Sequence, residues 1–154
     1  MVYARSDDAM PASTPLSLTE RGTTLMKESS RYGCGSCWPD SADAAWESCL
    51  RLKENRIFIE ESHLRVTIRQ CHQCGQSFLY VFTETIDWVN GEDPQYRSLL
   101  PLTEDEVTQF AESEFTEATL RGLRVPRCCL QRDLPDSDPP RVYWSAGFYA
   151  RSND

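Results

Sequence analysis

The sequence predicts an α+β fold, in which a small antiparallel sheet is packed against two helices. Two strand-like runs, 64–69 and 77–88, are separated only by a short turn and so predict a hairpin. Two other segments, 41–53 and 104–118, carry apolar side chains at helical spacing. With 154 residues, 40% of them apolar, the chain is long enough for a single hydrophobic core. We therefore expect one domain over residues 31–154.

Residues 1–30 precede the predicted domain and differ from it in composition. They are rich in Ser, Thr and Ala and contain few large apolar side chains, which predicts a flexible N-terminal arm. Beyond the arm, Asp40 or Ser41 can cap a helix that runs to about Lys53. The apolar residues of that helix fall on one side: Ala45, Trp46, Cys49 and Leu50.

Strands are predicted through the middle of the chain. Residues 56–60 form a short, partly alternating run, and apolar and polar side chains alternate in residues 64–69, as in a half-buried strand. Residues 77–88 carry large apolar side chains on both faces, so we expect both sides of this strand to be covered at its start. A further short strand is expected at 97–102.

The C-terminal part begins with a strong helix signal. Thr103 and Glu106 form a capping-box pattern, and Gly122 is expected to end the helix that follows. After a basic segment and a loop at 133–140 that is rich in Pro and Asp, residues 142–149 predict the last strand. The apolar stripe of the predicted helix consists of Val107, Phe110, Ala111, Phe115 and Ala118.

Two Cys-x-x-Cys pairs are the main chemical signal. Four thiolates at this spacing can hold one zinc ion in a tetrahedron, with no position left for water. The sequence therefore predicts a structural Zn²⁺ site at Cys34, Cys37, Cys71 and Cys74. The alternatives are four buried thiols without metal, or a redox-active pair, although no strand leads into the first pair as a thioredoxin-like site requires. The other cysteines are expected to be buried thiols: Cys49, Cys128 and Cys129.

The two pairs and the segment 64–88 resemble zinc-ribbon and zinc-knuckle proteins. In that arrangement, the second pair lies at the tip of a zinc-knuckle hairpin, where Gly75 permits the turn. Trp38 departs from the pattern, because a glycine commonly follows the second cysteine. The cysteine turn, the aromatic strand, an Asn-Gly acidic loop and the Thr-Glu-Asp-Glu helix together resemble uncharacterised small bacterial zinc-ribbon proteins, a likeness that implies no function.

Charge suggests what the domain binds. The net charge is −8, and ten acidic residues but only one basic residue lie between Glu84 and Ala118. We predict a non-enzymatic, zinc-stabilised protein-binding module whose acidic surface, 84–118, binds a basic protein partner, for example as an immunity protein that blocks a toxin. The competing view is that this acidity only keeps the protein soluble. The candidate partner-binding residues are Asp87, Trp88, Glu92, Asp93, Glu104, Asp105 and Glu106.

A nucleic-acid-binding zinc ribbon is the alternative function, although the net acidity disfavours it. The sequence has only two histidines and no Gly-rich phosphate loop, and so shows no set of catalytic residues. We therefore predict that the protein is not an enzyme. No apolar run approaches the roughly 18 residues of a membrane span, and a signal-peptide core is missing, so we expect a cytoplasmic protein. The arginine patch of the alternative consists of Arg65, Arg69, Arg121, Arg124, Arg127 and Arg132.

Overall fold

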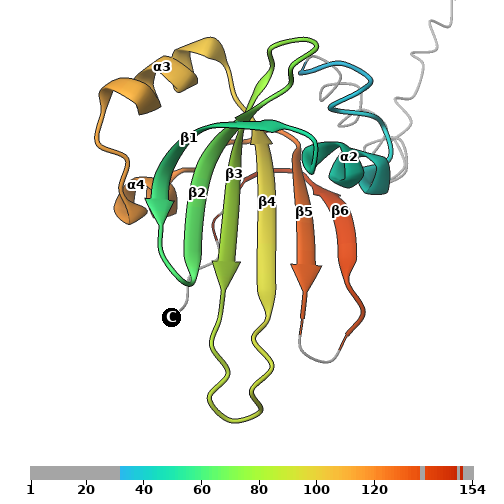
Figure 1. Ribbon diagram of the computed structural model, residues 1–154, viewed down its shortest axis with the longest axis vertical. Coiled ribbons are helices and arrows are strands. Elements are labelled where there is room, and N and C mark those ends of the chain that lie inside the picture. The colour runs from blue at the N-terminus through green and yellow to red at the C-terminus, as the bar shows by residue number, and fades with distance from the viewer. Residues whose placement is uncertain (1–31, 136–137, 149, 151–154) are drawn as a thin grey trace, which may run out of the picture.

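The protein is built around a six-stranded antiparallel sheet whose strands follow one another in chain order (Figure 1). A computed structural model describes residues 32–135, 138–148 and 150, so the predicted arm, 1–30, lies outside the described residues. The strands are β1 (Lys53–Glu60), β2 (Leu64–Gln70), β3 (Ser77–Glu84), β4 (Gln95–Pro101), β5 (Cys129–Leu134) and β6 (Arg141–Ser145). The described helices are α2 (Ala42–Cys49), α3 (Glu104–Glu112) and α4 (Glu117–Gly122). These elements confirm the α+β class.

Both faces of the sheet are covered, as the apolar pattern of β3 predicts. Successive residues of a strand point to opposite sides. On one face, Leu79 and Val81 are buried in a cluster that includes Phe110 of α3 and Leu120 of α4. The opposite face of β3 belongs to a second cluster, which α2 and the loop before it complete. That cluster contains Cys37, Trp38, Ala45, Cys49, Cys71, Phe78, Tyr80, Leu99 and Leu130.

The predicted helix starts are confirmed in the structure. Ser41 caps α2, where its side chain accepts a hydrogen bond from the Ala44 N–H at 3.4 Å. Thr103 and Glu106 form the reciprocal capping box at the start of α3. The first helix ends at Cys49 and not near Lys53, because Lys53 already pairs with Gln70 as part of β1.

The prediction of one continuous helix after Thr103 is wrong. The chain forms α3 and then α4, so the described residues contain three helices and not two. The Ser113 hydroxyl donates to the carbonyl of Gln109 at 2.7 Å, where α3 ends, and the Thr116 side chain caps α4. Between them, Phe115 stacks on Phe58 with ring centres 4.6 Å apart. The break thus lets Phe115 pack against the bent strand β1.

The prediction from the sequence also omits one strand and places the ends of two strands incorrectly. Strand β5 lies between β4 and β6, where a basic segment and the start of a loop were predicted. Its polar residues Gln131 and Asp133 are buried, which hides the apolar signal of an interior strand. The third strand ends at Glu84 and not at Trp88, and the last strand ends at Ser145. Beyond it, Phe148 forms an isolated bridge with Val125.

The β2–β3 turn and the β3–β4 loop, which carry predicted site residues, lie at opposite ends of the sheet. The β2–β3 turn lies at the end near α2, and the chain also leaves β4 there to enter α3 (Figure 1). The loop between β3 and β4 extends beyond the other end of the sheet. Among the described helices, none has both the length and the apolar character needed to cross a membrane.

Candidate metal centre and partner-binding residues

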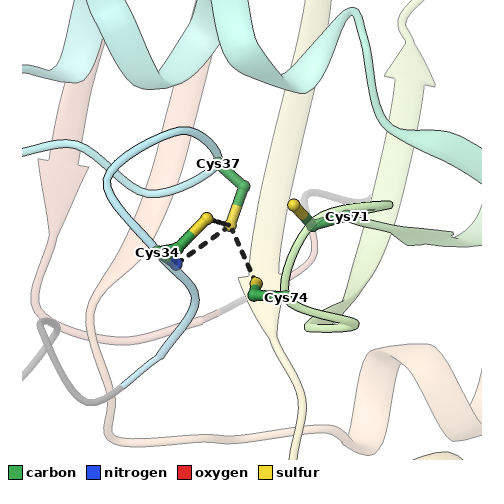
Figure 2. Close-up of side chains that lie close together, drawn as sticks. All are labelled: Cys34, Cys37, Cys71 and Cys74. Carbon is green, nitrogen blue, oxygen red and sulfur yellow. Dashed lines mark hydrogen bonds between the residues drawn. The ribbon is translucent and has the colours of Figure 1, made fainter.

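Four cysteine sulfurs converge from two loops that are distant in the sequence. Cys34 and Cys37 precede α2, whereas Cys71 and Cys74 lie in the β2–β3 turn (Figure 2). All four Sγ atoms lie within 4.8 Å of one another, and Cys37 Sγ is 3.8 Å from Cys34 Sγ and 3.7 Å from Cys74 Sγ. Zinc–sulfur bonds of about 2.3 Å give a tetrahedron with edges of about 3.8 Å. The cluster can therefore bind a metal ion such as zinc.

The first loop directs backbone N–H groups toward sulfur. The carbonyl of Cys34 accepts hydrogen bonds from the N–H groups of Cys37 at 3.1 Å and Trp38 at 2.8 Å, which close a tight turn. The backbone N–H groups of Ser36 and Cys37 lower the pKa of the Cys34 thiol to about 7. Donors aimed at a sulfur favour its thiolate form, which is the form that binds metals. Burial acts in the opposite direction at Cys37, where it raises the pKa.

The second loop has the glycine turn that the sequence predicts. The N–H of Gly75 donates to the carbonyl of Cys71 at 2.9 Å, and the N–H of Cys71 donates to the carbonyl of Gln76 at 2.9 Å. Gly75 has a φ of 78°, a left-handed conformation that favours glycine. This geometry holds Cys71 and Cys74 on the same side of the turn, facing the first loop.

Gln76 links the two loops, and sequence reasoning did not identify it. Its Oε1 accepts a hydrogen bond from the N–H of Gly33 at 3.2 Å. Its Nε2 donates to the carbonyls of Ser77 and Leu102, each at 2.8 Å. One side chain therefore joins the first cysteine loop to the start of β3 and the end of β4. No pattern in the sequence distinguishes this glutamine from an ordinary surface residue.

Trp38 explains why the first loop departs from the zinc-knuckle pattern. Its side chain is buried and packs on Phe78, with ring centres 5.2 Å apart, and on Trp144, at 4.8 Å. A glycine at this position would leave the loop without an apolar anchor on the sheet. The tryptophan thus holds Cys37 beside β3 and β6.

Gly33 provides a test of how tightly the first loop is packed. Its φ is 73°, and a Cβ atom there would lie 2.7 Å from Cys37 Sγ. We expect Gly33→Ala to lower the free energy of unfolding by about 2 kcal/mol or more, through backbone strain and the clash. Gly35→Ala is the matched control, because nothing lies within 4 Å of its added Cβ. Equal denaturant midpoints for the two variants would contradict the observed loop geometry.

The predicted partner-binding residues fall into two separated groups. The tip group, in the β3–β4 loop, contains Asp87, Trp88, Glu92 and Asp93. The helix group, at the start of α3, contains Glu104, Asp105 and Glu106. The structure does not bring these groups together, because the seven residues of β4, or about 20 Å of strand, separate them (Figure 1).

Hydrogen bonds organise the tip group into an ordered loop. The Asp87 carboxylate accepts from the N–H of Val89 at 2.8 Å, and from the N–H and side-chain amide of Asn90. These donors, led by the Val89 N–H, lower the pKa of Asp87. Asp93 closes the loop by accepting from the N–H of Asp87 at 2.8 Å. The result presents Trp88 and Val89 to solvent, with 88% and 89% of their surface exposed.

Glu106 of the helix group is occupied within the fold. Both of its oxygens accept hydrogen bonds from the guanidinium of Arg127, and one also accepts from the N–H of Thr103. Arg127 additionally donates to the carbonyl of Pro101 at 2.7 Å. These contacts fasten α3 to the end of β4. Glu104 and Asp105 remain exposed beside it.

The pH dependence of stability should report the contact between Glu106 and Arg127. Burial alone would raise the pKa of Glu106, but hydrogen bonds from Arg127 and Thr103 outweigh it and hold the pKa below 4.5. A lowered pKa in the folded state stabilises the protein above pH 4.5, and this contribution is lost as the pH falls through the folded value. We expect Glu106→Gln to cost about 1–2 kcal/mol at neutral pH and progressively less in acid.

Urea unfolding at several pH values measures this difference. The control is Glu104→Gln, which changes an exposed residue of the same helix turn and should leave the stability within about 0.5 kcal/mol of wild type. A cost for Glu106→Gln that stays constant with pH would show that the carboxylate charge does not matter.

The arginines of the predicted nucleic-acid patch make contacts within the fold. Arg65 pairs with two glutamates, at 2.8 Å and 2.6 Å, and Arg121 and Arg127 pair with acids of the 84–118 stretch. Arg69 and Arg132 lie over the rings of Tyr80 and Trp46. These residues lie on β2, α4 and β5 and on the segment between the last two.

No protein-family model, curated protein or solved structure matches this chain. The four clustered cysteines are compatible with a zinc ribbon, in agreement with the resemblance drawn from the sequence. The other three cysteines are buried, as predicted, and do not belong to this set of four: Cys49, Cys128 and Cys129. The features of the described chain that bear on function are the cysteine cluster and the exposed surfaces.

Proposed function

We propose that this chain is a non-enzymatic protein-binding module that presents its β3–β4 loop to a basic protein partner. A structural zinc ion, held by Cys34, Cys37, Cys71 and Cys74, would stabilise the fold. The observation that carries the proposal is the exposure of Trp88 and Val89 on a loop that is held in shape by its own hydrogen bonds.

Zinc is the metal that best suits this set of donors. Four thiolates with tetrahedral spacing are typical of structural zinc sites, and no fifth donor or open position is needed. The turn at Gly75 and the N–H groups directed at the Cys34 sulfur support the finer proposal of a zinc-knuckle hairpin. The ion would tie the loop before α2 to the β2–β3 turn, and would contribute no reaction of its own.

The β3–β4 loop has the properties of an interface anchor. Tryptophan is enriched among the residues that dominate binding energy, and an exposed tryptophan gains most when a partner removes it from water. A loop that is already ordered loses less conformational entropy on binding. Three carboxylates, those of Asp87, Glu92 and Asp93, surround this anchor, so a basic partner would be attracted and oriented.

An immunity protein that blocks a basic toxin is the specific form of this proposal. Nuclease toxins recognise phosphates, and clustered carboxylates can occupy the same basic surface. The nucleic-acid-binding alternative has less support, because Arg65, Arg121 and Arg127 are already paired with carboxylates of the same chain. Arginines that are engaged in this way have fewer donors left for a phosphate backbone.

Two measurements distinguish these functions. The tagged full chain is used to capture partners from its source cells, and its binding to generic DNA and RNA is measured at low salt. We expect a basic protein that is released as salt rises, and no measurable nucleic-acid binding. Tight binding to generic nucleic acid with a steep salt dependence would contradict the proposal.

A further inference from the structure

A row of arginine and aromatic side chains crosses the face of the sheet on which α2 packs. Arg65 of β2 lies opposite Phe82 of β3, Phe82 lies opposite Arg97 of β4, and Arg97 lies opposite Arg132 of β5. Residues paired directly across strands share one face of a sheet. The next row toward α2 is buried, whereas this row is only half-buried. It therefore lies at the border between the covered and the open part of this face.

Two neighbouring guanidinium groups in this row form no ion pair within the part of the chain that the structure describes. Arg65 is neutralised by Glu54 and Glu60. Neither Arg97 nor Arg132 takes part in an ion pair with any residue that the structure describes. Like charges placed directly opposite each other destabilise a sheet. The described residues thus supply no counterion to this pair, at a place where one would stabilise the fold.

The acid in the neighbouring row of this face is already engaged. Glu84 lies one row away from Arg97, and its Oε1 accepts a hydrogen bond from Gln95 at 2.8 Å. Its other oxygen lies 3.2 Å from Nδ1 of His63. Glu84 is therefore held by two neighbours and forms no ion pair with Arg97 within the described chain.

Aromatic rings hold the two guanidinium groups in place. The guanidinium carbon of Arg97 lies 4.9 Å from the ring centre of Phe82, and that of Arg132 lies 5.1 Å from the ring centre of Trp46. Arg97 Nη2 donates to Gln95 at 2.9 Å, but its Nη1 is shielded from solvent and has no partner among the described residues. Donors that are fixed in this way are prepared to meet an acceptor, and the described residues supply none for Nη1 of Arg97.

We propose that Arg97 and Arg132 bind the phosphate group of a small organic phosphate. Adjacent strands are about 5 Å apart, so two guanidinium groups can contact one tetrahedral oxyanion. The apolar borders of the pair, Phe82, Trp46 and the neighbouring Val142, would pack against the organic part of the ligand. This site lies on the sheet face, apart from the β3–β4 loop, and does not depend on the proposed partner.

Calorimetric titration of the purified full chain tests the site, with adenosine monophosphate and inorganic phosphate as probes. We expect the nucleotide to bind more tightly than phosphate alone, because only the nucleotide offers a ring to the apolar borders. Arg97→Gln and Arg132→Gln should each weaken nucleotide binding by about tenfold or more. Melting curves recorded in parallel confirm that each variant is folded.

Arg56→Gln is the matched control. Arg56 also lies over an aromatic ring, 5.2 Å from the centre of Phe58, but it is exposed on the edge strand β1. Its loss should change the affinity by less than about twofold. Unchanged binding in the Arg97 and Arg132 variants, or no heat with either probe at about 10 mM, would overturn the proposal. A dimer of the ligand-free protein that Arg97→Gln dissociates would also overturn it, since a second copy would then occupy the row.

Discussion

Removal of the proposed zinc ion is expected to unfold much of the domain. The loop before α2 carries Cys37 and Trp38, both buried in the cluster that also contains α2 and one face of β3. Apart from this packing, the hydrogen bonds that join that loop to the second cysteine turn within the described residues are few: Gly33 donates to Gln76, and the sulfurs of Cys37 and Cys74 lie 3.7 Å apart. Structural zinc binds small domains with a free energy of about 10–16 kcal/mol, and this energy contributes to folding. It is comparable to the whole stability of a domain.

Elemental analysis of the purified protein should find one zinc ion per chain. Addition of a strong chelator should then lower the melting temperature sharply, and circular dichroism should show the loss of secondary structure. Restoring zinc should reverse the change, because the thiols remain free to rebind. A metal-free protein with the stability of the original would show that these cysteines are ordinary core residues.

A pair of cysteine variants separates metal binding from simple burial. Cys37 and Cys49 have 1% and 0% of their surface exposed, and they belong to the same cluster. Cys37→Ser removes a candidate ligand, whereas Cys49→Ser only places a hydroxyl in the core. We expect the first variant to lose zinc and much of its stability, and the second to keep its zinc at a cost of about 1–3 kcal/mol. Equal zinc content in the two variants would contradict the assignment of the ligands.

Features that depend on neighbouring residues could be predicted from the sequence. The capping box at Thr103 and Glu106 is local, and so are the turn at Gly75 and the cysteine pairs. The apolar pattern of β3 also predicts burial on both faces, since it is read along one strand. In each case the physical cause lies within a few residues of its effect.

Features that depend on long-range pairing could not be predicted. Strand β5 could not be recognised because it buries polar side chains, which hydrogen-bond to residues on other strands. Ser98 of β4 donates to Gln131, and the hydroxyl of Tyr143 on β6 donates to Asp133 at 3.1 Å. The arginine row likewise exists only because the register of the sheet aligns Arg97 with Arg132. Periodicity along one segment contains no information about such partners.

The division of the acidic stretch into two distant groups also results from long-range structure that the sequence pattern does not contain. The carboxylates between Glu84 and Ala118 are continuous in the sequence, but β4 carries the chain from one end of the sheet to the other. Glu106 then turns inward to Arg127, whereas the acids around Trp88 stay at the exposed tip. A test of partner binding should therefore concentrate on the β3–β4 loop.

Trp88→Ala is expected to abolish most of the partner affinity without changing stability. The side chain is 88% exposed, so its removal costs the folded state almost no buried surface. In a complex, a buried tryptophan at the centre of an interface contributes about 2 kcal/mol or more, which corresponds to at least a 30-fold rise in Kd. The measurement is surface plasmon resonance with the captured basic partner, together with melting curves of the variant.

Two further variants show whether the loss of partner affinity is specific to the β3–β4 loop. Leu50→Ala removes another exposed apolar side chain, 60% exposed at the end of α2, and should change the Kd by less than about twofold. Glu92→Gln should mainly slow association and weaken its salt dependence, because peripheral charges steer the encounter more than they hold the complex. If Trp88→Ala and Leu50→Ala bind the partner equally well, the β3–β4 loop is not the contact surface. Loss of binding only in the Trp88 variant, at an unchanged melting temperature, would assign the contact to this loop.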